Sequence, residues 1–357
     1  MIRRATFAIG GLIALAAASL SVPAAELHLA SAVQQADCPG NPNAIGTSRT
    51  IVVDPTEHPL VGGMQYRESL PLQDHEVVLT FDDGPLPPFS NRVLEILASE
   101  CVKANYFLVG RMALSFPDVV RRIYEAGHTI GTHSQSHPLR KMPIQHAERE
   151  INDGIASVTS TLGDGIAPAP FFRFPGLLRS EAVESYLASQ HLMTWSIDFL
   201  ADDWMKISPA QVYARALARV EAHGKGILLL HDIHERTVEA LPYLLRELKQ
   251  RGYRIVHVVA ATPDLPKTAT DPCQWIIHAR QISPQVAGPS RGRVKTGTPS
   301  AEPGKLRAKA CRPVFGSPPP GTASAHRPHP QPHSAAAGAD LAAQPQRSCR
   351  VRTVVNK

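Results

Sequence analysis

Several features that mark common protein classes are missing from this chain of 357 residues. Its five cysteines include no Cys-x-x-Cys pair, so the sequence indicates neither a zinc finger nor a thioredoxin-like redox protein. No Gly-x-Ser-x-Gly elbow joins a predicted strand to a predicted helix, which argues against a serine esterase. Internal repeats are also lacking, and their absence excludes a fold built from stacked repeat units.

Long apolar runs are nearly absent, and beyond the N-terminus no segment has the length of a transmembrane helix. The exception begins the chain. Two arginines precede an uncharged apolar run at residues 7–20, and small residues follow up to Ala25. This pattern is typical of a secretory signal peptide, here 1–25, with an uncleaved membrane anchor as the alternative. We expect an exported protein, periplasmic or secreted, that keeps no stable membrane span after cleavage.

Acidic and basic residues are unevenly distributed along the chain. Residues 263–357 hold 14 Lys and Arg against 4 Asp and Glu, although the formal net charge of the whole chain is only +6. The rest of the chain is therefore mildly acidic, and a nucleic-acid partner is not expected. The same C-terminal segment contains 15 of the 32 prolines and little periodic apolar pattern. We predict that 263–357 is a basic, Pro-rich, disordered tail.

Residues 26–73 are rich in turn-forming and small polar residues, with one β-like run at Thr50–Val53. We interpret this segment as an N-terminal extension that packs on the following domain. In an oxidising compartment Cys38 would pair with Cys101 or with Cys273, and the sequence does not decide between the two pairings.

From residue 74 to 262 short apolar runs alternate with longer helical patterns. Some helix ends are chemically marked, since Ser208 and Pro209 form a helix start and Gly224 and Gly252 follow two helix ends. Repeated β–α units predict an α/β fold with a parallel sheet, closed into a barrel or left open. The predicted strands are 76–81, 104–109, 128–132, 171–174, 193–197, 226–231 and 254–258, and the predicted helices are about 89–101, 117–126, 144–162, 180–190, 209–223 and 236–251.

Charged and polar side chains stand where five of the predicted strands end. Because the C-terminal ends of parallel strands share one face, we expect these side chains to meet at one rim, where such folds build active sites. Their placement after five separate strands argues against coincidence. The residues are Asp82 and Asp83, His133 and His137, Arg173, Asp198, and His231 with Asp232.

These residue types suit one kind of chemistry. An aspartate with His133 and His137 is a common three-ligand set for Zn²⁺ or a similar divalent ion, with positions left for water and substrate. A second, neighbouring carboxylate would take the proton of the activated water, and an imidazole across the site would protonate the leaving group. Arg173 would orient the base and favour its ionised form. The pattern predicts metal-dependent hydrolysis.

At these residues the chain resembles the polysaccharide deacetylase family, also called the NodB-homology or carbohydrate esterase family 4 domain. The resemblance covers roughly residues 74–262 and rests on the runs TFDDGP at 80–85 and HSQSH at 133–137, with LLH at 229–231 in support. It implies a distorted (β/α) barrel of about seven parallel strands. It also implies Asp82 as general base, Asp83, His133 and His137 as metal ligands, and His231 as general acid.

The chain departs from the family pattern in the third motif, where members have an aromatic residue between Pro and Gly. Here Gly176 directly follows Pro175. The backbone amide of the oxyanion hole is therefore expected at Gly176 or Leu177.

The fourth motif also departs from the family pattern, because three residues separate Asp198 from the Asp202-Asp203-Trp204 run. We expect Asp203 or Asp198 to steady Arg173, and Trp204 to line the pocket for the acetyl methyl group.

Together these features predict a metal-dependent deacetylase acting on N-acetylglucosamine-containing or other acetylated polysaccharides and oligosaccharides, such as peptidoglycan or chitooligosaccharides. Zn²⁺ is the expected cofactor, with Co²⁺, Ni²⁺ and Mn²⁺ as alternatives. Two other functions stay open: a C–N hydrolase of small cyclic amides, and an inactive carbohydrate-binding protein on the same fold. The sequence does not indicate an oligomeric state.

Overall fold

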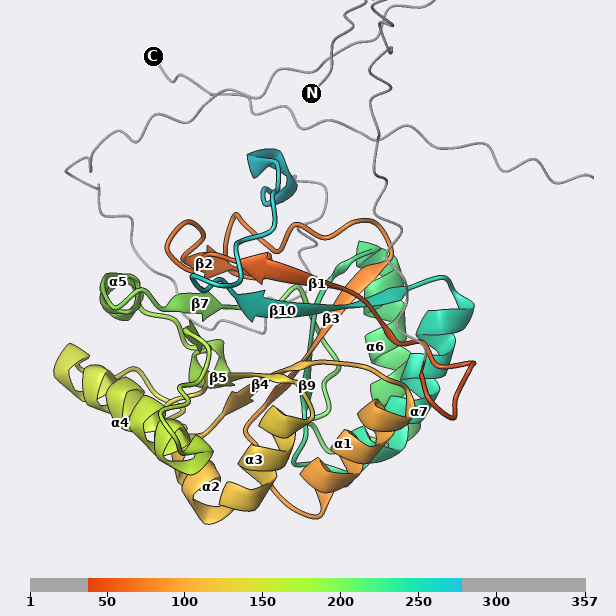
Figure 1. Cartoon of the computed structure of the whole chain (residues 1–357), viewed down its shortest axis with the longest axis horizontal. Coiled ribbons are helices and arrows are strands. Elements are labelled where there is room, and N and C mark those ends of the chain that lie inside the picture. The colour runs from red at the N-terminus through yellow and green to blue at the C-terminus, as the bar shows by residue number, and fades with distance from the viewer. Residues whose placement is uncertain (1–37, 278–357) are drawn as a thin grey trace, which may run out of the picture. The chain divides into compact units, whose positions relative to one another are not determined.

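Ten parallel strands organise residues 38–277, the part of the chain that the computed structural model describes (Figure 1). Every ladder between named strands is parallel, as βαβ connections require. The seven predicted strands are all present, and three more, the longer β1 and the two-residue β2 and β8, join them. The strands are β1 (Thr47–Val53), β2 (Leu60–Val61), β3 (Glu76–Asp82), β4 (Asn105–Leu108), β5 (Thr129–Thr132), β6 (Phe171–Phe172), β7 (Met193–Trp195), β8 (Phe199–Leu200), β9 (Gly226–His231) and β10 (Arg254–Ala260).

The strands form a distorted (β/α) barrel, which confirms the predicted fold class. From β3 one path of ladders runs through β4, β5 and β6 to β7, and another runs through β9 to β8. β7 and β8 are consecutive pieces of one chain segment, separated only by residues 196–198. The chain itself therefore joins the two ends of the path, and this irregular junction is where the barrel departs from a regular ring.

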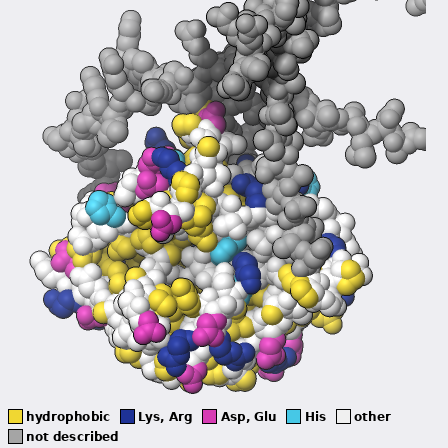
Figure 2. All heavy atoms as spheres, viewed as in Figure 1, with side chains coloured by type: hydrophobic (Ala, Val, Ile, Leu, Met, Phe, Trp, Pro, Cys, Tyr) yellow, Lys and Arg dark blue, Asp and Glu magenta, His cyan; other side chains and the backbone are white. Residues whose placement is uncertain are grey.

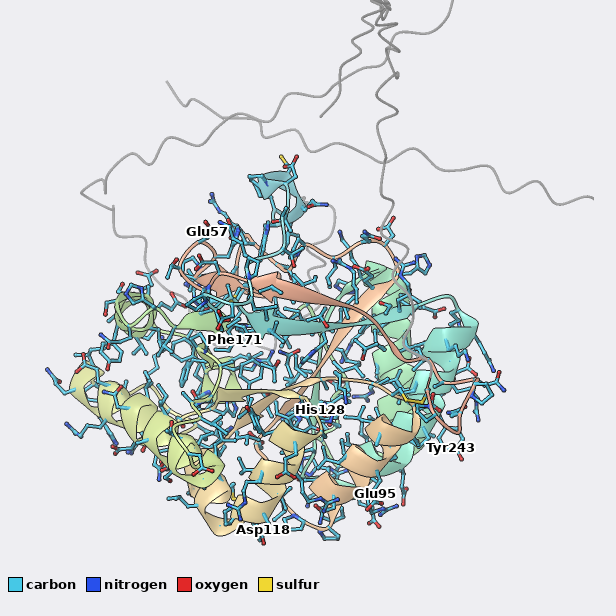
Figure 3. The ribbon with its side chains drawn as sticks, viewed as in Figure 1. Glu57, Glu95, Asp118, His128, Phe171 and Tyr243 are labelled. Atoms are coloured by element: carbon cyan, nitrogen blue, oxygen red, sulfur yellow. A yellow bond between two sulfur atoms is a disulfide. The ribbon has the colours of Figure 1, made fainter. Side chains whose placement is uncertain are left out.

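Helices line the left, lower and right sides of the strands in Figure 1, whereas β1 and β2 form the upper side. The six predicted helices are present, and a short additional one, α2, follows β4. Figure 3 shows the labelled Glu95, Asp118 and Tyr243 on the outer surface of this layer, whereas Phe171 lies among the strands. The helices are α1 (Phe89–Ser99), α2 (Gly110–Ser115), α3 (Pro117–Glu125), α4 (Ile144–Leu162), α5 (Glu181–Ser189), α6 (Pro209–His223) and α7 (Glu235–Gln250), with 3₁₀ turns η1 (Pro175–Leu177) and η2 (Pro272–Gln274).

Two apolar layers lie on either side of the strands, and the alternation along each strand decides which residues join which layer. Along β3, Leu79 and Phe81 pack in the layer under the helices, whereas Val78 packs in the inner layer with Phe107 and Trp195. The residues two and four positions after Val78 are Thr80 and Asp82, so they share its inward face. The last residue of β3 is in this way directed toward the mouth of the barrel.

The predicted extension and the start of the predicted tail both contribute to the described unit. The β-like run at 50–53 is part of β1, which pairs with β10, and Cys38 forms a disulfide with Cys101. Residues 263–277 fold back onto this region, where Trp275 is buried and its ring stacks on His58 with centroids 3.5 Å apart. The predicted signal peptide and the remainder of the predicted tail lie outside the described residues.

In the described part of the chain, none of the helices has the length and apolar character that crossing a bilayer requires.

Replacing Trp275 with Ala should lower the free energy of unfolding by about 3 kcal/mol or more, because the buried indole leaves a cavity behind. The matched control is Trp204→Ala, since Trp204 is 58% exposed and its loss should cost about 0.5 kcal/mol or less. Urea unfolding of the chain measures both values. Equal effects of the two substitutions would show that the segment around Trp275 does not stabilise the fold.

Candidate active site

A buried ion pair lies at the C-terminal end of the barrel. Arg173 follows β6 and is fully buried, and its Nη1 donates to Asp82 Oδ1 at 2.6 Å and to Thr80 Oγ1 at 2.8 Å. The Phe107 ring packs against the guanidinium, 4.1 Å from Cζ to the ring centroid. One oxygen of Asp82 is thereby fixed, and the other, Oδ2, lies 3.7 Å from His133 Nε2.

Asp83 points into the same site although it is the neighbour of Asp82. A strand continuing beyond Asp82 would direct the next side chain toward the helices. The φ of Asp83 is instead 74°, a left-handed conformation that turns its carboxylate toward the site. Its Oδ1 lies 3.4 Å from His133 Nε2 and 3.0 Å from His137 Nε2.

Gly84, the next residue, has no room for a side chain. A Cβ there would lie 2.2 Å from Oδ1 of Asp232, a carboxylate that is fully buried behind this turn. Burial raises the pKa of Asp232 to about 7. Asp232 was noticed in the sequence only as the residue after His231, and the structure gives it a position directly against the Asp83–Gly84 turn.

The Asp83, His133 and His137 side chains fit a divalent cation. Their ligand atoms all lie within 4.8 Å of one another. His133 Nδ1 lies 2.7 Å from the carbonyl oxygen of Arg173, so the ring donates there and presents Nε2, with its lone pair, to Asp83. Lone pairs of a carboxylate and an imidazole directed at one point are stabilised by a cation between them, and three protein ligands leave positions for water and substrate.

A further imidazole, that of His231, borders this cluster and is paired with a carboxylate, that of Asp203. His231 ends β9, and its Nδ1 lies 2.8 Å from Asp203 Oδ1, while its Nε2 lies 3.9 Å from Asp83 Oδ2. Asp203 Oδ2 also accepts from the His231 amide and from Thr237 Oγ1, both at 2.7 Å, so its orientation is fixed. Burial alone would lower the pKa of His231, but Asp203 and the site carboxylates raise it to about 9. The imidazole is thus held in its protonated form.

The expected partner of Arg173 is found only in part, because the charge of Asp198 favours the charged guanidinium without a hydrogen bond between them. Neither Asp203 nor Asp198 hydrogen-bonds Arg173, whose Nη2 instead donates to the carbonyl oxygen of Ser196 at 3.2 Å. Asp203 partners His231. Asp198 accepts from the amides of Gly63 and Ile227, both at 2.7 Å, and from Ser69 Oγ at 2.8 Å. Asp198 makes no hydrogen bond to Arg173 because it lies at the irregular β7–β8 junction, where its side chain binds backbone amides of other segments.

The turn after Arg173 contains the two residues expected to offer the oxyanion-hole amide. Gly176 and Leu177 both have left-handed backbone, with φ of 56° and 57°. The Leu177 amide donates to the Phe174 carbonyl oxygen at 2.9 Å and is therefore engaged. Gly176 is exposed, which makes its amide the better candidate of the two.

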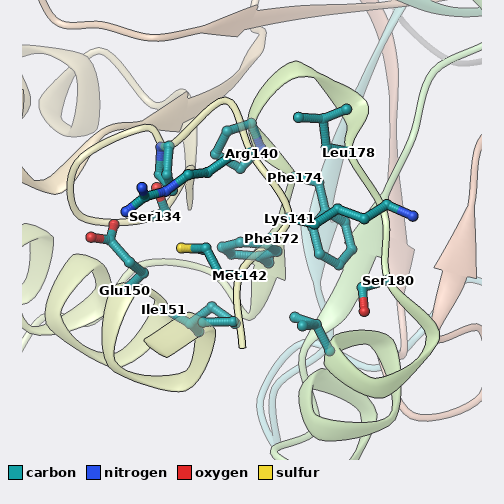
Figure 4. A pocket seen from close by; sticks show the side chains of 14 residues that line it. Ser134, Arg140, Lys141, Met142, Glu150, Ile151, Phe172, Phe174, Leu178 and Ser180 are labelled. Carbon is teal, nitrogen blue, oxygen red and sulfur yellow. The ribbon is translucent and has the colours of Figure 1, made fainter. Parts of the chain in front are cut away.

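A pocket lies beside this turn, between the loop that follows His137 and the start of α5 (Figure 4). Its floor is apolar, with Met142, Phe172 and Phe174, and Arg140 and Lys141 lie at its rim. Figure 2 shows hydrophobic side chains gathered on this face over the region between α4 and α5. The indole of Trp204 does not line this pocket, and its predicted place in an acetyl-binding pocket stays a prediction.

The fold and the site together define a class of protein, a (β/α) barrel with a candidate metal site at its mouth. Comparison with known proteins gives the family. A family model described as polysaccharide deacetylase matches residues 70–195. A peptidoglycan-N-acetylglucosamine deacetylase of Bacillus cereus is 33% identical over 201 residues, which are 54% of this chain and 70% of that protein. The chain belongs to the polysaccharide deacetylase family.

Other relatives match the same region. The peptidoglycan-N-acetylglucosamine deacetylase PgdA of Listeria monocytogenes is 32% identical over 188 residues, 51% of this chain but only 38% of that protein. The chitooligosaccharide deacetylase of Rhizobium leguminosarum bv. trifolii is 28% identical over 51% of this chain and 89% of its own length. Among solved structures, a peptidoglycan deacetylase of Bdellovibrio bacteriovorus has a TM-score of 0.55 and 33% identity, covering 60% of each chain.

Asp83→Asn and His137→Ala should each weaken divalent metal binding by roughly tenfold or more, because each removes one of three protein ligands. Asp82→Asn should leave the metal bound, since Asp82 is directed to Arg173. The control is His146→Ala, because His146 lies outside the cluster and 4.0 Å from Glu150. Metal content after dialysis and calorimetric titration with Zn²⁺ give the measurement. Full metal occupancy in Asp83→Asn would contradict the assigned ligand set.

Proposed function

We propose that this chain is a metal-dependent deacetylase that removes acetyl groups from N-acetylglucosamine-containing or other acetylated polysaccharides or oligosaccharides. The observation that carries the proposal is that two proton-handling groups lie beside one set of candidate metal ligands, with Asp82 Oδ2 3.7 Å from His133 Nε2 and His231 Nε2 3.9 Å from Asp83 Oδ2. Asp82 is fixed by a cation, Arg173, and His231 is fixed by an anion, Asp203. A hydrolytic reaction needs one group to accept a proton and another to donate one, and opposite partners prepare the two groups for these tasks.

A divalent cation held by Asp83, His133 and His137 would polarise the acetyl carbonyl and lower the pKa of a water molecule. The protein's own residues then move the protons. Asp82 accepts a proton from the attacking water at Oδ2, because Oδ1 is occupied by Arg173. The backbone amide of Gly176 donates to the developing oxyanion.

His231 completes the reaction by donating its Nε2 proton to the departing amine or alkoxide. The Nδ1 contact to Asp203 directs Nε2 toward Asp83 and the reacting atoms. With a pKa of about 9, the imidazole carries the required proton at neutral pH. A cation bound at Asp83 would offset part of that carboxylate's contribution and bring this pKa down toward the working range.

The names of the relatives favour a glycan substrate, since they include peptidoglycan-N-acetylglucosamine and chitooligosaccharide deacetylases. We infer a substrate of the same class here, with Zn²⁺ as the first candidate among the metals that an Asp-His-His set accepts. We also infer export through the predicted N-terminal signal, because such polymers lie outside the cytoplasm. The pocket of Figure 4 borders the Gly176 turn and is in a position to receive a part of the substrate away from the acetyl group.

Acetate release is the direct test. The chain without its predicted signal peptide should release acetate from chitooligosaccharides or peptidoglycan, lose this activity with chelator and regain it with added Zn²⁺. Asp82→Asn should lower kcat by about 10³-fold or more with metal still bound, because the proton acceptor is missing. Release at the wild-type rate by Asp82→Asn would exclude this mechanism. No release from any substrate, despite bound metal, would favour an inactive glycan-binding protein.

The pH dependence of kcat/KM should depend on Asp203. His231 must be protonated to act, so activity falls as pH rises through its pKa. Asp203→Asn removes the anion that raises this pKa and should move the alkaline limb to lower pH by roughly one to three units. Asp202→Asn is the matched control, because Asp202 binds Arg215 and Arg219 instead, at 2.8 Å each. Identical alkaline limbs in wild type and Asp203→Asn would show that His231 is not the acid.

A further inference from the structure

A turn from the N-terminal segment reaches the site from outside the region that the family model matches. That match covers residues 70–195, whereas the turn consists of residues 62–66. Its Gln65 side chain is half-buried and makes two hydrogen bonds to the catalytic region. Nε2 donates to the carbonyl oxygen of Leu177 at 2.8 Å, and Oε1 accepts from Ser196 Oγ at 2.8 Å.

The first of these bonds fixes the turn that carries the candidate oxyanion amide. Gly176 and the non-glycine Leu177 are both left-handed, a conformation that an L-residue rarely adopts unless its surroundings hold it. In the family pattern an aromatic residue stands between Pro and Gly of this motif, and this chain lacks it. Gln65 orients the Leu177 carbonyl group, so the peptide plane after Leu177 cannot rotate freely. The turn is thus held through a hydrogen bond to its backbone and not through an aromatic side chain.

The second bond connects the same side chain to the general base. Ser196 donates its hydroxyl to Gln65, and its carbonyl oxygen accepts from Arg173 Nη2 at 3.2 Å. Arg173 Nη1 in turn binds Asp82. Gln65 is therefore joined through Ser196 and Arg173 to Asp82, and it touches the oxyanion turn directly with its other end.

The turn that carries Gln65 is itself rigidly attached to the barrel. Gly62 has a φ of 110° and lies so close to Ser196 and Ile197 that a Cβ would meet their backbone at 2.5 Å. The Gly63 amide donates to Asp198 Oδ1 at 2.7 Å. This contact explains the buried Asp198, whose pKa is raised by burial and whose two oxygens accept from the amides of Gly63 and Ile227.

Tyr66 adds a further attachment at the other end of the oxyanion turn. Its hydroxyl donates to Glu184 Oε1 at 2.7 Å, and the same carboxylate accepts two hydrogen bonds from Arg179 at 2.6 and 2.8 Å. Successive residues, Gln65 and Tyr66, thus hold both sides of the segment from Leu177 to Arg179.

We propose that Gln65 is a positioning residue that sets the Gly176–Leu177 turn for oxyanion stabilisation and couples it to the Arg173–Asp82 pair. The inference rests on the proposed deacetylase function. It gives the N-terminal segment a role in the catalytic rate of that reaction. Because Gln65 touches neither the metal ligands nor His231, its contribution should be to the rate of the chemical step and not to metal binding.

The test uses Gln65→Glu, a substitution of nearly equal size that still accepts from Ser196 Oγ but presents a carboxylate oxygen to the Leu177 carbonyl. We expect kcat for acetate release to fall about 10- to 100-fold, with KM within about twofold and Zn²⁺ affinity unchanged. Gln73→Glu is the matched control and should have wild-type kcat, because Gln73 is an exposed glutamine of the same segment whose side chain accepts from Arg254 Nη2, away from the site.

Hydrogen exchange gives a readout that does not depend on activity. The amides of Leu177 and Leu178 donate to Phe174 and Pro175 carbonyl oxygens, at 2.9 and 3.1 Å, and should exchange faster in Gln65→Glu while β3 and β9 keep their protection. Wild-type exchange in the turn, faster exchange throughout the barrel, or an unchanged kcat would each overturn the proposal. If the wild-type chain released no acetate, the proposed function would fail, and the exchange data alone would still decide whether Gln65 holds the turn.

Discussion

The buried guanidinium of Arg173 is the group on which the rest of the site depends. A buried charge destabilises a protein unless a partner compensates it and hydrogen bonds satisfy its donors. Asp82, Thr80 and the Ser196 carbonyl oxygen supply these partners, and they come from β3 and from the β7–β8 junction. The carbonyl oxygen of Arg173 also accepts from His133, so the same residue orients Asp82, the proposed base, with its side chain and His133, a proposed metal ligand, with its backbone. The base and the metal site therefore have a common support.

Non-glycine residues with a positive φ occur where neighbouring side chains contact different partners. Five of the nine non-glycine residues with positive φ in the described chain belong to the site or directly border it, each costing about 1 kcal/mol or more. Asp82 and Asp83 both reach the site because the strand alternation ends between them. Asp202, with a φ of 58°, faces the arginines of α6 while Asp203 faces His231. The five residues are Asp83, Ser134, His137, Leu177 and Asp202.

Sequence reasoning predicted what depends on local periodicity and on parallel topology. Alternation and apolar runs predicted the seven main strands. The shared C-terminal rim of parallel strands predicted that six side chains meet at one place, namely Asp82, Asp83, His133, His137, Arg173 and His231. The Ser196 carbonyl oxygen, a further partner of Arg173, was missed because it belongs to the three residues between β7 and β8, where neither a strand nor a helix pattern applies. Gln65 was missed for another reason: its contact to Leu177 joins residues 112 positions apart, and nothing in the local sequence of either records it.

The same long-range contacts explain why the parts before β3 and after β10 are joined to the barrel. β1 pairs with β10, β2 pairs with β7, and Trp275 packs under the segment that leads to Gly62. These contacts restrict the movement of the 62–66 turn. Gln65, which belongs to this turn, in turn restricts the Gly176–Leu177 turn through its hydrogen bond to Leu177. A donor amide stabilises a transition state in proportion to how little it must reorganise. In the proposed mechanism, the rigidity of the 62–66 turn therefore contributes directly to the reaction at the proposed metal ligands, although the turn contacts none of them.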